Sequence, residues 1–110
     1  MPQPEAIVSI DADGVITEFS PESETIFGYR AEDVIGKPLT ELLIPPRFQR
    51  AHTEGFDRFL RSGQGKLLDT EEPISLTLMR ADLSEFTVRF LMAAILDGKR
   101  TIYRSRVQPL

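Results

Sequence analysis

The chain has 110 residues, of which 41% are hydrophobic and 27% are charged. These values match one globular domain and exclude a disordered chain. The formal net charge is −4 and the basic residues are scattered, which argues against a nucleic-acid-binding face. The sequence contains no cysteine, which excludes disulfides, thiolate metal sites, cysteine nucleophiles and covalent cysteine adducts.

The first part of the chain predicts a β-hairpin. Residues 6–10 and 15–19 are rich in β-branched side chains and are separated by an Asp/Gly-rich turn. Asp11 and Asp13 in this turn could also begin a calcium loop, but the later ligands of such a loop are missing. We therefore expect a plain turn.

Several brief helices are predicted next. Ser20 followed by Pro21 favours a helix start, because serine accepts a hydrogen bond from a first-turn N–H and proline suits the first helical position. Gly28 is expected to end this helix. Shorter helical turns are expected over residues 30–35 and 39–44, since glycine and proline follow them.

Residues 47–61 predict the longest helix. Phe48, His52 and Phe56 recur at helical spacing and form one stripe along it. The acidic stretch at residues 69–72 is expected to be a solvated loop and not a metal cluster.

The C-terminal part predicts three strands in a meander. Residues 74–79 and 86–93 show the period of two that strands require, an Asp-Gly pair at residues 97–98 marks a hairpin, and residues 99–107 predict a last strand. The whole order predicts an α+β fold with one antiparallel sheet and its helices on one face.

Six segments in this order resemble the PAS domain family over nearly the whole chain: AIVSIDADGVI at 6–16, IFGY at 26–29, EDVIGK at 32–37, LLIPP at 42–46, RADLSEF at 80–86 and LDGKR at 96–100. The resemblance implies a PAS fold. In that fold a five-stranded antiparallel sheet carries short helices and one longer helix on one face, with a pocket between them. Residues 1–110 are then expected to form a single PAS domain with no output domain. Leu83 departs from the family pattern, because a turn glycine is common there, and a positive φ at this residue would cost about 1 kcal/mol.

The expected pocket has a histidine in its wall. A neutral imidazole on the apolar stripe of the long helix is what haem iron requires of a proximal ligand. The segment around His52 is similar to haem-binding oxygen-sensor PAS domains, and this resemblance implies His52 as the iron ligand. The alternative is a structural histidine that packs and hydrogen-bonds locally.

The apolar lining of the pocket is predicted from the inward stripes of the long helix and two strands, and consists of Phe48, Phe56, Leu76, Leu78, Phe90 and Met92. We do not expect flavin as the cofactor, because light-sensing flavin PAS domains use a cysteine and this chain has none. No metal other than haem iron is expected.

Arg104 and Arg106 lie on one face of the last predicted strand. We expect them on the outer face of the sheet, and the alternative places them in the cleft, where they could clamp a carboxylate or phosphate. Leu91 and Ala93, with Ile102, are expected to leave apolar area exposed on the outer face, which favours a homodimer or another partner there.

The predicted function is sensory. A small ligand would bind in the cleft, and its presence would be relayed to an output domain or partner signalling protein, as in a two-component system. Two alternatives remain, a haem-based gas or redox sensor with His52 as proximal ligand, and a ligand-free dimerisation module. We expect no catalytic activity, because no spacing brings an acid and a base together among Asp11, Asp33, Tyr29 and Tyr103. Since no apolar run reaches the roughly 20 residues of a membrane span, a cytoplasmic location without membrane or nucleic-acid partners is expected.

Overall fold

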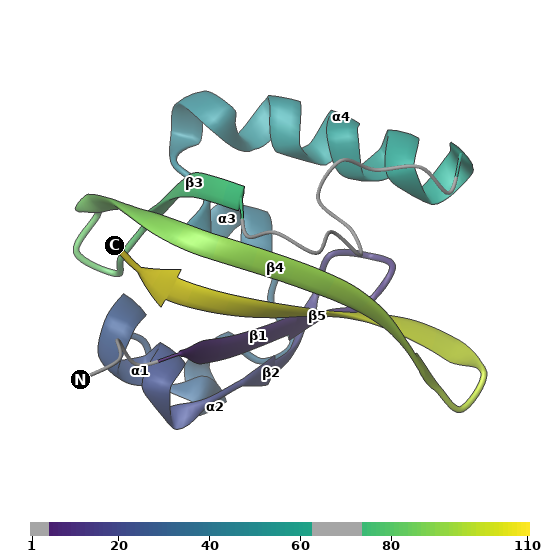
Figure 1. The fold of residues 1–110 in the computed structure, drawn as a ribbon, viewed down its shortest axis with the longest axis horizontal. Coiled ribbons are helices and arrows are strands. Elements are labelled where there is room, and N and C mark those ends of the chain that lie inside the picture. Colours follow the sequence, from purple (N-terminus) through teal and green to yellow (C-terminus); the bar gives the residue numbers. More distant parts are fainter. Residues whose placement is uncertain (1–4, 63–73) are drawn as a thin grey trace.

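The chain folds into one antiparallel sheet with its helices on one side (Figure 1). The computed structural model describes residues 5–62 and 74–110. Their elements are β1 (Ala6–Ile10), β2 (Ile16–Phe19), α1 (Pro21–Phe27), α2 (Ala31–Val34), α3 (Leu39–Leu43), α4 (Pro46–Ser62), β3 (Ile74–Met79), β4 (Glu85–Asp97) and β5 (Arg100–Pro109). The predicted α+β fold, with five strands and one longer helix, is confirmed.

The strand order is β2-β1-β5-β4-β3, so the last strand lies at the centre of the sheet. All pairs are antiparallel, and β1 pairs with β5 from Ala6 opposite Val107 to Ile10 opposite Tyr103. The β4–β5 hairpin continues to Asp97, well beyond the part of β4 that pairs with β3. This overhang is visible in Figure 1. Near its tip, no other strand among the described residues pairs with the hairpin.

Helix α1 begins and ends as the sequence predicts. The Ser20 side chain accepts hydrogen bonds from the backbone N–H groups of Ser23 at 3.3 Å and Ile7 at 2.9 Å. Pro21 occupies the first helical turn, and Gly28 closes the helix at φ 83°. Ser20 thus joins the helix start to β1, because one hydroxyl serves both elements.

The Asp-Gly turn after β1 uses its aspartate within the turn. Asp11 Oδ1 accepts hydrogen bonds from the N–H groups of Asp13 at 2.9 Å and Val15 at 3.1 Å. The predicted turn is present, and the Gly14 N–H donates to the Asp11 carbonyl at 3.0 Å within it. Nowhere in the described part of the chain do three His, Asp or Glu side chains come together as a metal site. The acidic stretch at 69–72 lies outside the described residues.

The turn between β3 and β4 contains Leu83, at a position where a glycine is common in the family. This residue has φ 73°, as its position predicts. Backbone hydrogen bonds from Leu83 N–H to the Arg80 carbonyl and from Arg80 N–H to the Ser84 carbonyl, both 2.9 Å, close a three-residue loop. Such loops place their last residue in the left-handed region, where glycine is preferred.

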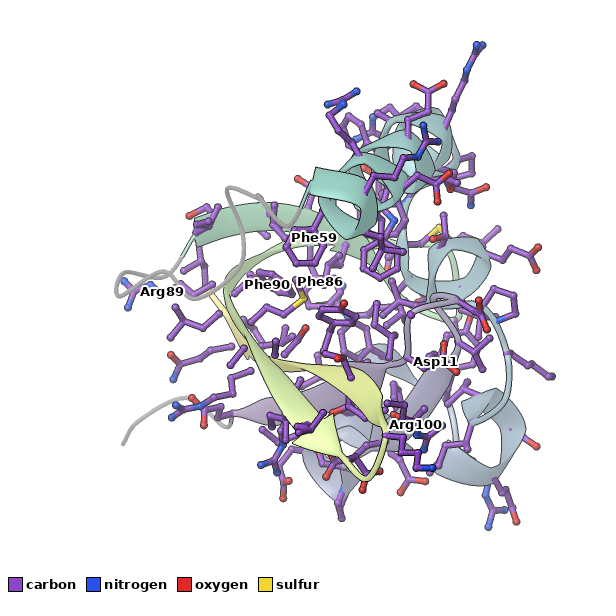
Figure 2. The ribbon with its side chains drawn as sticks, turned by 90° about the vertical axis from the view of Figure 1, so that its right-hand side faces the viewer. Asp11, Phe59, Phe86, Arg89, Phe90 and Arg100 are labelled. Atoms are coloured by element: carbon purple, nitrogen blue, oxygen red, sulfur yellow. The ribbon has the colours of Figure 1, made fainter. Side chains whose placement is uncertain are left out.

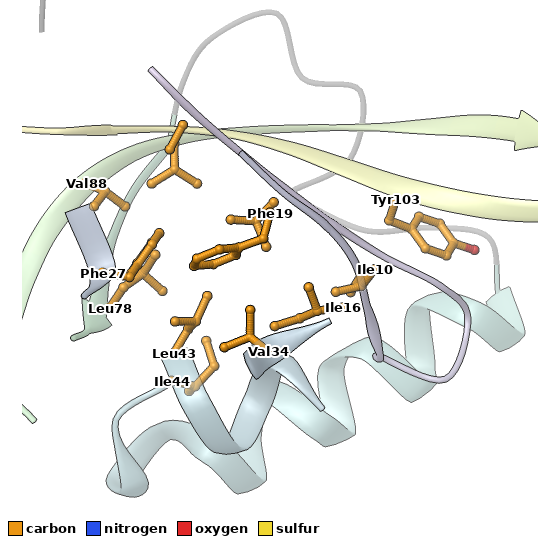
Figure 3. Close-up of a cluster of buried hydrophobic side chains, with 13 residues drawn as sticks. Ile10, Ile16, Phe19, Phe27, Val34, Leu43, Ile44, Leu78, Val88 and Tyr103 are labelled. Atoms are coloured by element: carbon orange, nitrogen blue, oxygen red, sulfur yellow. The ribbon is translucent and has the colours of Figure 1, made fainter. Parts of the chain in front are cut away.

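The core lies between the sheet and α1, α2 and α3 (Figure 3). Phe27 is fully buried at its centre, with its ring 5.9 Å from that of Phe19 and 5.6 Å from that of Phe86. Burying such a side chain contributes about 1.5–3 kcal/mol. Within residues 5–62 and 74–110 no helix is long and apolar enough to cross a membrane.

Candidate functional site

A cavity of about 980 Å³ lies between α4 and the inner face of the sheet. Figure 2 shows Phe59 from α4 and Phe90 from β4 directed into this region, whereas Arg89 points away from it. The structure places every predicted pocket residue in the cavity wall, namely Phe48, His52, Phe56, Leu76, Leu78, Phe90 and Met92. Their role in binding a ligand stays a prediction.

Strand alternation explains the floor of the cavity. On the central strands, Phe90 lies opposite Val107 and Met92 lies opposite Ser105, and all four line the cavity. Because neighbouring residues of a strand point to opposite faces, one register directs this whole set inward. Ser105 is the polar member of this set of four, and Ser75 and Thr77 of β3 add two further hydroxyl side chains to the lining.

Helix α4 forms the roof. Phe56 and Phe59 both meet the ring of Tyr103 edge-on, with centroids 5.6 Å apart in each pair. The other end of the helix is held by a two-bond ion pair between Arg47 and Glu85 at the start of β4. These contacts hold α4 over the sheet and leave the space between them open.

His52 is fixed in the roof by a neighbouring helix. Its Nδ1 lies 3.1 Å from Thr40 Oγ1 of α3, and the side chain is largely buried. Burial lowers the pKa of His52, which favours the neutral imidazole. Because Nδ1 is engaged by Thr40, Nε2 is the nitrogen available to a ligand. Sequence reasoning missed Thr40, since nothing in the spacing of 12 residues signals this contact.

Arg104 and Arg106 lie on the outer face of the sheet, as predicted. Arg104 Nε is 3.3 Å from Glu18 Oε1, and Arg106 Nε is 3.1 Å from Glu5 Oε1. Neither arginine lines the cavity. The alternative, an anion clamp in the cleft, is therefore wrong.

The exposed apolar surface on the sheet is displaced from the prediction. Ile102 was expected to be exposed but is only 8% exposed, because it packs across the hairpin opposite Ile95. Ile95 and Leu96 are 41% and 76% exposed instead. Ala93 is exposed, as expected, and Leu91 is partly buried. The apolar surface lies nearer the hairpin tip than the sequence indicated.

The acidic and phenolic residues considered for catalysis are not brought together. Tyr29 Oη donates to the Leu42 carbonyl at 3.5 Å, Asp33 is exposed on α2, and Asp11 is engaged in its turn. Tyr103 packs beneath Phe56 and Phe59.

The fold and the cavity agree with a known family. A family model described as PAS domain matches residues 4–107. The chain belongs to the PAS domain family. Its PAS fold is also found in the PAS domain of an HTR-like protein from Haloarcula marismortui, with a TM-score of 0.75 and 19% identity over 97% of this chain and 82% of that one.

Two further similar proteins extend the comparison. The PAS domain of the quorum-sensing receptor RpfR from Cronobacter turicensis, solved in complex with BDSF and with C12:0, has a TM-score of 0.70 and 19% identity over 94% of this chain and 92% of that one. An uncharacterized protein of Azorhizobium caulinodans is 31% identical over 96% of this chain. The PAS domain described here spans only 14% of that relative's length.

Proposed function

We propose that this PAS domain is a sensor that binds a small, largely apolar ligand in the cavity between α4 and the sheet. The cavity itself carries the proposal, because about 980 Å³ lies within the range of small-molecule sites and its walls are mainly aliphatic and aromatic. The binding of BDSF and C12:0 by the RpfR PAS domain supports it, since that domain has the same fold.

Ligand binding would change the positions of the helix and strands that form the cavity walls. A molecule that fills the cavity touches α4 on one side and the central strands β4 and β5 on the other. A change in their spacing would be relayed to an output domain or to a partner of a two-component signalling protein. The much greater length of the Azorhizobium relative supports an output elsewhere in the polypeptide. A cytoplasmic location and a homodimer are part of this proposal.

The test is a thermal-shift screen with C8 to C14 fatty acids and alcohols on the wild type and two variants. Met92→Trp fills the cavity, whereas Ala93→Trp places the same side chain on the exposed outer face of the same strand. We expect ligands to raise the Tm of the wild type and the Ala93→Trp variant, but not that of the Met92→Trp variant. Equal shifts in all three proteins would contradict binding in this cavity.

A second candidate function, a haem-based gas or redox sensor, is favoured by the Thr40–His52 contact. A hydrogen bond at Nδ1 orients a metal-binding imidazole and leaves Nε2 toward the metal, as second-shell partners commonly do. Gly55, in the same helix, also lines the cavity, and a Cβ at this position would meet no atom within 4 Å. His52 would hold the iron, and haem would supply gas binding or electron transfer. An absorption spectrum with added haemin tests this, and a Soret band that persists in the His52→Ala variant would exclude His52 as the ligand.

A third candidate function is a ligand-free dimerisation module, which the exposed Ile95 and Leu96 of the β4–β5 hairpin favour. Sedimentation of the wild type and of the Leu96→Ser variant tests it. We expect a dimer that the substitution weakens, and a monomeric wild type would contradict the idea.

A further inference from the structure

Three serines are buried in the described part of the chain, and their hydroxyls differ in one respect. Ser9 donates to Glu18 at 2.8 Å, and Ser23 donates to the Ile7 carbonyl at 2.8 Å. The Ser105 hydroxyl forms no hydrogen bond with any residue that the structure describes, although the residue is only 6% exposed. Buried hydroxyls are normally paired, so Ser105 calls for an explanation.

The position of Ser105 in the cavity wall explains why its hydroxyl has no protein partner among the described residues. It lies on the central strand β5, opposite Val8 of β1 and Met92 of β4, and all three line the cavity. Since residues 5–62 and 74–110 contain no enclosed side-chain oxygen or nitrogen without a partner, the Ser105 hydroxyl opens onto the cavity. A β-branched apolar residue would suit this strand position better. The hydroxyl is therefore placed where a ligand can reach it.

Gly55 in the roof is a second position whose residue type the fold does not require. It lies inside α4, where glycine costs up to about 1 kcal/mol relative to alanine. Its φ is not positive, and a Cβ at this position would meet no atom within 4 Å. Neither backbone geometry nor packing demands glycine here. Gly55 is part of the cavity wall.

The charge of the wall limits the ligand. Arg58 is the one formally charged side chain among the described residues that line the cavity, and it is exposed. Burial lowers the pKa of His52 and so favours its neutral form. A carboxylate or phosphate buried in this cavity would have no buried counter-charge from these residues, and burying an unpaired charge is costly.

We propose that the cavity takes an uncharged, mainly aliphatic molecule with a hydroxyl or carbonyl group that hydrogen-bonds to Ser105 Oγ, and that the body of this molecule lies against the α4 backbone at Gly55. This inference rests on the proposed function, because it concerns the same cavity. Ser105 and Gly55 are then specificity-determining residues of the cavity.

Isothermal titration at pH 8 with decan-1-ol and with decanoate tests the inference, because the two probes share an alkyl chain and differ in charge. We expect the wild type to bind decan-1-ol at least tenfold more tightly than decanoate. The Ser105→Thr and Ser105→Val variants have side chains of the same shape, and only threonine keeps the hydroxyl. We expect Ser105→Val to bind decan-1-ol about three- to tenfold more weakly than Ser105→Thr, the usual effect of one neutral hydrogen bond.

A second pair of variants tests the roof. Gly55→Leu fills the open space, whereas Thr53→Leu adds the same side chain to an exposed position of α4. We expect only Gly55→Leu to weaken decan-1-ol binding by tenfold or more. Both variants are checked for folding by circular dichroism, and the valine–threonine pair at Ser105 decides the matter if Gly55→Leu does not fold.

The outcomes separate the two proposals. If no probe of either class binds the wild type, the proposed function fails. If decanoate binds as tightly as decan-1-ol, or if Ser105→Val and Ser105→Thr bind decan-1-ol equally, the inference about Ser105 and an uncharged ligand is overturned while the sensory function stands.

Discussion

The backbone at Leu83 allows a clean measurement of local strain. Leu83 is the one non-glycine residue with a positive φ in the part of the chain that the structure describes, and its side chain is 69% exposed. The turn around it is well bonded, because Asp82 Oδ1 accepts from the Ser84 N–H at 2.9 Å. The turn therefore keeps its shape when residue 83 changes.

The magnitude follows from comparing two substitutions at this position. Leu83→Gly and Leu83→Ala both remove the same exposed side chain, so their difference isolates the backbone. In the alanine variant the Cβ still clashes with the backbone in the left-handed region, which destabilises the folded state by roughly 1–2 kcal/mol. The glycine variant avoids this clash, but its more flexible unfolded chain lowers the stability by about 0.4–1 kcal/mol. We expect Leu83→Gly to be the more stable by about 1 kcal/mol, or roughly 4 °C in Tm.

Urea denaturation followed by circular dichroism measures this difference. Thr87, exposed on β4 with an ordinary φ, is the matched control, and there the glycine variant should be less stable than the alanine variant by about 0.5–1 kcal/mol. A Leu83→Ala variant as stable as Leu83→Gly would refute the reasoning, because the turn would then carry no strain at residue 83.

Three other predictions concern the capping serine, the core and the histidine. Ser20→Ala should lower the free energy of unfolding by about 2 kcal/mol in urea titration, since a helix cap and the partner of the Ile7 N–H are lost together; a loss below 0.5 kcal/mol would contradict this. Phe27→Ala should cost about 3–5 kcal/mol in thermal denaturation, because the ring is fully buried, and a marginal effect would place the core elsewhere. Burial lowers the pKa of His52 in the folded state, so the unfolded chain binds a proton at this residue more readily than the folded chain does. The free energy of unfolding should therefore decrease as the pH drops below about 6.5, by no more than about 1.4 kcal/mol per pH unit. The free energy of unfolding is measured for the wild type and a His52→Asn variant between pH 7.5 and 5, and the difference between the two should become smaller as the pH falls. If the two proteins show the same pH dependence, burial does not perturb the pKa of the imidazole.

The sequence predicted those parts of the structure that depend on local patterns. The alternation over residues 74–79 matches β3, and the Asp-Gly pair lies at the tip of the β4–β5 hairpin. The face of α4 that lines the cavity followed from the spacing of Phe48, His52 and Phe56. Each of these signals lies within one element, where period and turn chemistry decide.

Features that depend on the distance between elements were not predictable in this way. The bulky phenylalanines could equally have filled the space beneath α4, and only the position of the helix leaves about 980 Å³ open. The Thr40–His52 contact joins two helices, and the burial of Ile102 depends on its cross-strand neighbour Ile95. That the Ser105 hydroxyl has no hydrogen-bond partner among the residues the structure describes is visible only in three dimensions.

The central position of β5 also governs how the chain can fold. Until this last strand is present, β1–β2 and β3–β4 are two separate hairpins, because the register from Ala6 opposite Val107 onward joins residues about 100 positions apart. Isolated two-stranded hairpins are marginally stable in water, and closing so long a loop slows folding. During synthesis on the ribosome the five-stranded sheet can therefore form only after β5 has emerged.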